Sequence, residues 1–113
     1  MIQTSVNKLG PLTTMIANAG IAQVKPLLDL TESDMQRMFS INVFGVHNCF
    51  QLAAKQMISQ GPPPTLEASS SGPANPGVYK LISAASIVAF KPFPLLSHYS
   101  SSKWAVRGLT QGE

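Results

Sequence analysis

The chain has 113 residues, of which 44% are hydrophobic and 12% are charged, and so apolar a balance argues against a disordered chain. A chain of this length can form at most one domain of ordinary size. Its formal net charge of +3 is the balance of eight basic and five acidic residues, and the basic residues are scattered along the chain. Because no basic stripe is present, nucleic acid is not an expected partner.

The sequence also carries no sign of secretion or of membrane insertion. Cys49 is the only cysteine, so an internal disulfide cannot form. The first ten residues lack the continuous apolar stretch of a signal peptide. No run approaches the ~18 consecutive apolar residues of a membrane helix. A soluble cytoplasmic protein is therefore the expectation.

The first predicted elements are a helix and a strand. Residues 2–9 resemble the last turns of a helix, with Gly10 as its C-terminal cap. A helix that starts at the initiator methionine without a capping residue looks interrupted. Residues 12–17 form a short β-prone run that stops at Asn18-Ala19-Gly20, which is typical of a buried strand ending in a turn.

The segment 31–58 is predicted to form one long helix. Thr31 and Asp34 have the spacing of a capping box at its start. Ile41 and Phe44 point away from the apolar stripe, which indicates burial on more than one side. The stripe itself recurs at spacings of three and four and consists of Met35, Met38, Phe39, Val46, Cys49, Phe50, Ala53 and Met57.

A flexible loop rich in proline, glycine and serine is predicted at about 59–77. A second strand follows at 78–82, and a final helix starts near Ser97 and continues to the end at Glu113. Strand, helix, strand, helix predicts an α/β fold with parallel strands. Two parallel strands do not make a stable sheet alone. Residues 1–113 are therefore expected to form an incomplete domain.

Asn42 is the most informative single position. It falls in the middle of the apolar stripe, where an amide without hydrogen-bond partners costs about 1–3 kcal/mol. One interpretation is a residue that caps or kinks the helix by bonding to neighbouring backbone. The other is a functional residue, and the sequence alone favours neither.

Tyr99 and Lys103 lie four residues apart at a helix start, so their side chains can share one face. A lysine ammonium beside a phenol stabilises the phenolate, which lets the tyrosine exchange a proton with a carbonyl or an alcohol near neutral pH. Ser86 could bind the same carbonyl, although a serine after a strand is more often a turn or cap residue. His47 and His98 have no spaced partners, so a metal site is not predicted.

Taken together, these residues resemble the short-chain dehydrogenase/reductase family over nearly the whole chain. The family pattern is matched in order by Asn18-Ala19-Gly20, Asn42, Ser86 and Tyr99-x-x-x-Lys103. Residues 84–86 and 99–111 are most similar to the acetoin/diacetyl reductase and butanediol dehydrogenase branch. The resemblance implies the central βαβα portion of a Rossmann-like, doubly wound parallel sheet that binds NAD or NADP.

The resemblance also implies roles for these residues. Tyr99 would be the general acid/base, and Lys103 would stabilise its phenolate while bonding the nicotinamide ribose. Ser86 would hold the substrate oxygen, Asn42 would keep a water in a proton relay, and Asn18, Ala19 and Gly20 would line the cofactor cleft.

The implied activity is NAD(P)-dependent reduction of a small ketone or diketone, or oxidation of a secondary alcohol, in a homo-oligomer. Two family positions differ, at Ala17 and Ala89, and the sequence contains no G-x-G-x-x-G turn for the pyrophosphate. This chain alone is therefore expected to be inactive. The alternative is a non-catalytic remnant that at most associates with other subunits.

Overall fold

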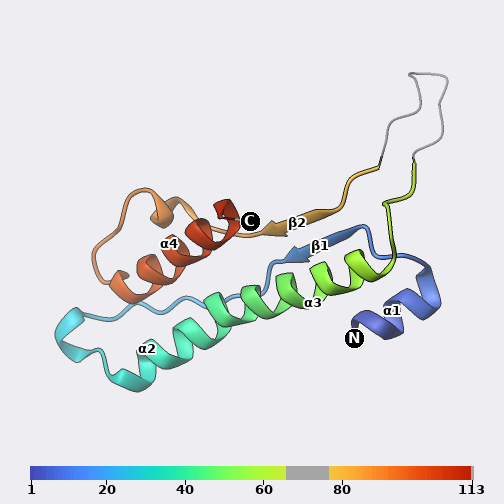
Figure 1. Cartoon of the computed structure of the whole chain (residues 1–113). Coiled ribbons are helices and arrows are strands. Elements are labelled where there is room, and N and C mark those ends of the chain that lie inside the picture. Colours follow the sequence, from blue (N-terminus) through green and yellow to red (C-terminus); the bar gives the residue numbers. More distant parts are fainter. Residues whose placement is uncertain (66–76, 113) are drawn as a thin grey trace.

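The computed structural model describes residues 1–65 and 77–112. A π-helical turn at Ser40–Phe44 joins two of the helices, and short 3-10 turns occupy Leu27–Asp29 and Ile87–Ala89. The regular elements, in chain order, are α1 (Ile2–Leu9), β1 (Thr14–Ala17), α2 (Glu32–Phe39), α3 (Gly45–Ser59), β2 (Lys80–Ser83) and α4 (Ser97–Gln111) (Figure 1).

The two strands form a parallel sheet, as predicted. Thr14 pairs with Lys80 at one end of the ladder, and Ala17 pairs with Ser83 at the other. Each strand starts two residues later than the apolar pattern indicated. The α/β class with parallel strands is confirmed.

One face of this sheet is packed and the other is open. The core joins Ala17 of β1 to Val46 and Phe50 of α3 and to Val106 of α4. On the opposite face, Ile16 is 61% exposed and Ile82 is 43% exposed. Parallel sheets are normally covered by helices on both faces. The described residues provide helices for one face, and the face with Ile16 and Ile82 stays exposed.

The long helix from Glu32 to Ser59 is confirmed, but it is not regular. Its capping box is complete, because the Thr31 hydroxyl accepts from the Asp34 amide and the Asp34 carboxylate accepts from the Thr31 amide. The prediction of an unbroken α-helix was wrong at Ser40–Phe44, where a π-helical turn is inserted. Such turns insert an extra residue into the helix and frequently occur at functional sites.

Two further predictions concern the loop and the last helix. Most of the expected loop at about 59–77 lies outside the described residues, because positions 66–76 are not described. The last helix starts at Ser97, as predicted, and ends at Gln111, while Glu113, to which the prediction extended, lies outside the described residues. Gly112 closes it by donating its amide hydrogen to the carbonyl of Gly108.

Thr31→Ala should lower the free energy of unfolding by about 1 kcal/mol at neutral pH, because the α2 amide at Asp34 loses its capping oxygen. Ser33→Ala, in the same exposed first turn, is the matched control and should have little effect. Urea unfolding of each variant, with this segment placed in a complete domain, measures the difference. Equal losses in the two variants would contradict the capping role.

The pH dependence of this capping contribution has a definite sign. The Lys25 ammonium, followed by the Thr31 amide and hydroxyl, holds the pKa of Asp34 well below its ordinary value of 3.8. A carboxyl group whose pKa is lowered in the folded state adds stability at pH values above its ordinary pKa. This stability is lost as the pH falls below that ordinary pKa. The difference between the wild-type chain and Thr31→Ala should therefore shrink in acid below pH 3.8.

Candidate active site

The carboxyl ends of β1 and β2 meet at one rim, as expected for parallel strands. Just past the strands, the Ala84 amide donates to the Ala17 carbonyl at 3.3 Å. Asn18, Ala19 and Gly20 leave β1 at this rim and are exposed. Rims of this kind are where open parallel sheets bind ligands.

Asn42 is buried, with 1% of its surface exposed, and lies inside the π-helical turn. Its Oδ1 accepts from the Ile21 amide at 2.8 Å. Its Nδ2 donates to the Ile21 carbonyl at 2.9 Å and to the Ser102 hydroxyl at 3.0 Å. Its side chain therefore connects the long helix to the loop after β1 and to α4, and does more than bond to neighbouring helix backbone.

Gly20 lies directly against this group. A Cβ at this position would lie 3.2 Å from Oδ1 of Asn42 and 3.6 Å from Nζ of Lys103. The first distance is tighter than ordinary van der Waals contact, and both neighbouring side chains are held by other bonds. A side chain here would push Asn42 aside by a few tenths of an ångström, against its hydrogen bonds to Ile21 and Ser102.

Lys103 and Tyr99 share one face of α4, as predicted. Lys103 is only 6% exposed, and its Nζ donates to the Ala84 carbonyl at 2.7 Å. The same Nζ lies 5.8 Å from the centre of the Tyr99 ring. Burial lowers the pKa of Lys103 from its ordinary value, because the ammonium has lost part of its hydration.

Ser86 follows β2 and starts the 3-10 turn Ile87–Ala89. Its hydroxyl accepts from the Val88 amide at 3.3 Å, which is the cap interaction that the simpler interpretation predicted. A serine hydroxyl that accepts one bond can still donate its own hydrogen. The capping geometry is thus compatible with a second contact to a carbonyl oxygen.

Sequence reasoning missed the partners of Asn42. The need for partners followed from its position in the apolar stripe, but nothing in the spacing pointed to Ile21 or Ser102. Ser102 is fully buried and also donates to the Tyr99 carbonyl at 2.7 Å. It therefore links Asn42 to the helix that carries Tyr99 and Lys103.

The other candidate residues lie apart from this site. His47 is exposed and Cys49 is half-buried in α3. Among the described residues, no group of three His, Cys, Asp or Glu side chains could hold a metal ion. In the same part of the chain, no helix combines the length and apolar character needed to cross a membrane.

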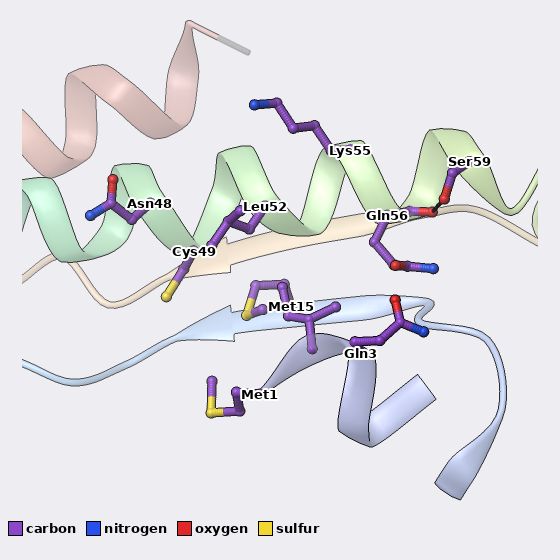
Figure 2. A pocket seen from close by; sticks show the side chains of 10 residues that line it. Met1, Gln3, Met15, Asn48, Cys49, Leu52, Lys55, Gln56 and Ser59 are labelled. Carbon is purple, nitrogen blue, oxygen red and sulfur yellow. Dashed lines mark hydrogen bonds between the residues drawn. The ribbon is translucent and has the colours of Figure 1, made fainter. Parts of the chain in front are cut away.

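A cavity of about 500 Å³ lies between α1, β1 and α3 (Figure 2). Met15, Cys49 and Leu52 contribute to its lining, which is largely apolar. None of the four predicted catalytic residues borders it. The residues predicted for catalysis therefore lie outside this cavity.

Comparison with known protein families identifies the family to which this chain belongs. The short chain dehydrogenase family model matches residues 1–112. The chain therefore belongs to the short-chain dehydrogenase/reductase family of oxidoreductases, as the order of its motifs indicated.

Several of the similar proteins are named as dehydrogenases or reductases of butanediol, diacetyl or acetoin. The chain is 43% identical over 110 residues to L-2,3-butanediol dehydrogenase of Corynebacterium glutamicum, covering 97% of this chain and 37% of that protein. It is 35% identical to a diacetyl reductase [(S)-acetoin forming] of Staphylococcus epidermidis, covering 98% of this chain and 37% of that protein. The chain thus spans a little over a third of these relatives.

Solved structures agree with the fold. An acetoin dehydrogenase from Salmonella typhimurium superposes with a TM-score of 0.78 at 27% identity, covering 98% of this chain and 38% of that one. A short-chain type dehydrogenase/reductase from Mycobacterium marinum gives 0.80 at 31% identity, covering 99% and 40%. The described α/β unit is therefore a portion of the family's larger fold.

Proposed function

We propose that this chain provides the catalytic portion of an NAD(P)-dependent oxidoreductase that reduces a small ketone or diketone, or oxidises the matching secondary alcohol. The observation that carries the proposal is Lys103, a nearly buried lysine whose Nζ lies at the strand rim and near the Tyr99 ring. The similarity to proteins described as butanediol dehydrogenase and diacetyl reductase supports this substrate class.

Each residue has a role in this proposal. Tyr99 exchanges the proton with the substrate oxygen, and the Lys103 ammonium stabilises its phenolate form. Ser86 donates its hydroxyl hydrogen to the same oxygen. Asn42, held rigidly by Ile21 and Ser102, keeps a water in the path by which the proton reaches solvent.

The rim residues fit the nicotinamide end of a dinucleotide. Lys103 offers a hydrogen-bond donor there, and the absence of a side chain at Gly20 leaves the approach to Asn42 and Lys103 open. Asn18 and Ala19 would line the cleft beside them. When bound, the nicotinamide supplies or accepts the hydride. No residue of this sequence distinguishes NAD from NADP.

A second candidate function is a non-catalytic protein that associates with other subunits. Exposed apolar side chains on its helices favour it, since Phe44 is 59% exposed and Trp104 is 46% exposed. Aromatic residues of this kind are enriched at protein interfaces. The two candidates differ in whether the rim residues perform chemistry.

A chimera separates these candidates. Replacing the matching stretch of the Corynebacterium glutamicum enzyme with this chain should retain oxidation of 2,3-butanediol, followed by formation of the reduced nicotinamide. The 113-residue chain alone should reduce diacetyl with neither NADH nor NADPH, because its sequence has no glycine-rich turn whose amides would bind the pyrophosphate.

The expected activity of the chimera and the expected inactivity of the isolated chain can each be contradicted. A folded chimera that binds dinucleotide without turnover would favour the non-catalytic candidate. Turnover by the isolated chain that disappears in Tyr99→Phe would show that the pyrophosphate turn is dispensable.

A further inference from the structure

The helix that carries Tyr99 begins without a capping side chain. The residue before its first turn is Leu96, which has no side-chain atom that can accept from the free amides. Leu95 has a φ of 63°, a left-handed conformation that is unfavourable for a residue other than glycine. Without a side-chain cap, contacts from elsewhere in the fold contribute more to the stability of the first turn of α4.

Those contacts come from the loop after β1, which passes the start of α4 (Figure 1). The Lys25 amide donates to the Leu95 carbonyl at 2.9 Å. The His98 Nε2 lies 3.1 Å from Oε1 of Gln23. His98 is fully buried and immediately precedes Tyr99, so this second contact acts directly on the turn that holds Tyr99.

The orientation of this contact is set by Asp34. The Nε2 of Gln23 donates to Oδ1 of Asp34 at 3.2 Å, and Oδ2 of Asp34 forms an ion pair with Lys25 at 2.6 Å. An ionised carboxylate only accepts hydrogen bonds. Gln23 must therefore turn its amide nitrogen toward Asp34 and its oxygen toward His98.

This orientation determines the tautomer of His98. Because Oε1 of Gln23 can only accept, the His98 ring must carry a hydrogen on Nε2. Its Nδ1 is buried and has no hydrogen-bond partner within the described part of the chain. A hydrogen placed there in place of Nε2 would leave a buried donor without an acceptor and break the bond to Gln23.

We propose that His98 and Gln23 are positioning residues, oriented by Asp34, that hold the first turn of α4 and thereby keep Tyr99 against Lys103. Lys103 is anchored separately, by its bond to the Ala84 carbonyl. If the first turn of α4 opens, Tyr99 moves while Lys103 stays. This inference rests on the proposed function, which gives the Tyr99–Lys103 pair its importance.

The distance between the two side chains can be followed by NMR in the chimera, where the rest of the domain is present. The nuclear Overhauser contact between the Tyr99 ring and the Lys103 Hε protons should be lost in His98→Leu and in Gln23→Leu. It should persist in His98→Gln, whose amide can donate to Gln23 in place of the ring. His47→Leu, the same change at an exposed histidine, is the control and should also retain it.

Retention of the contact in His98→Leu would overturn the proposal. If the leucine variants lose α4 altogether, the ring ¹⁵N shifts of His98 in the chimera without these substitutions test the proposal. A pyrrole-like Nε2 with a pyridine-like Nδ1 supports the proposal, and the reverse pattern overturns it. These measurements need neither cofactor nor turnover, so they test the positioning role separately from the catalytic role. The positioning role can be wrong although Tyr99→Phe abolishes catalysis in the chimera. It can equally be right although Tyr99→Phe leaves catalysis intact.

Discussion

Tyr99→Phe should lower kcat of the chimera by roughly 10²–10⁴-fold, the contribution typical of a positioned general acid or base. The substitution removes only the hydroxyl, so the ring that lies 5.8 Å from Lys103 remains. KM should change little, because the lost interaction acts on the transferred proton. Steady-state kinetics with 2,3-butanediol measure both constants.

The matched control is Tyr79→Phe. The Tyr79 hydroxyl donates to the Gly61 carbonyl at 2.8 Å, next to the end of α3 and away from the strand rim. This variant should retain full turnover. If Tyr99→Phe keeps more than about a tenth of the wild-type kcat, general acid–base catalysis by Tyr99 is excluded.

Asn42→Leu should produce the largest loss of stability, roughly 2–4 kcal/mol in the free energy of unfolding, since each buried group left unpaired costs about 1–3 kcal/mol. The substitution removes the partner of the Ile21 amide and carbonyl and of the Ser102 hydroxyl. It also places a branched side chain against Gly20. Urea unfolding of the chimera, followed by circular dichroism, measures the effect.

Asn48→Leu provides the control, because Asn48 is an exposed asparagine on the continuation of the same helix. Its replacement should change the free energy of unfolding by less than about 0.5 kcal/mol. A similar loss in the two variants would show that the bonds of Asn42 do not contribute beyond helix propensity. An Asn42→Leu chain as stable as wild type would contradict the bridging role directly.

Local patterns predicted most of the elements because each depends on residues close in sequence. The capping box of Thr31 and Asp34, and the helical spacing from Met38 to Met57, need only neighbouring positions. Element limits were less accurate. The apolar period continues through Ser40–Phe44, so it could not reveal that one turn there is π-helical.

The candidate site was predicted in part. The four residues proposed for catalysis were identified by their order along the chain, and the structure brings Asn42 and Lys103 together around Gly20. The bonds to Ile21 and Ser102 were not predicted, because they join segments that are far apart in sequence. The same holds for the contact between Gln23 and His98.

The sequence by itself determined the α/β class, the family and the residue types available for chemistry, since periodicity and motif order are properties of the chain alone. Only the tertiary structure decided which hydrogen bonds satisfy Asn42, how α4 starts without a cap, and where Lys103 is anchored. Those outcomes depend on burial and on the direction of donors and acceptors across separate elements. A polar residue in an apolar stripe indicates from the sequence that a hydrogen-bond partner is needed. Only the folded chain shows which residue that partner is.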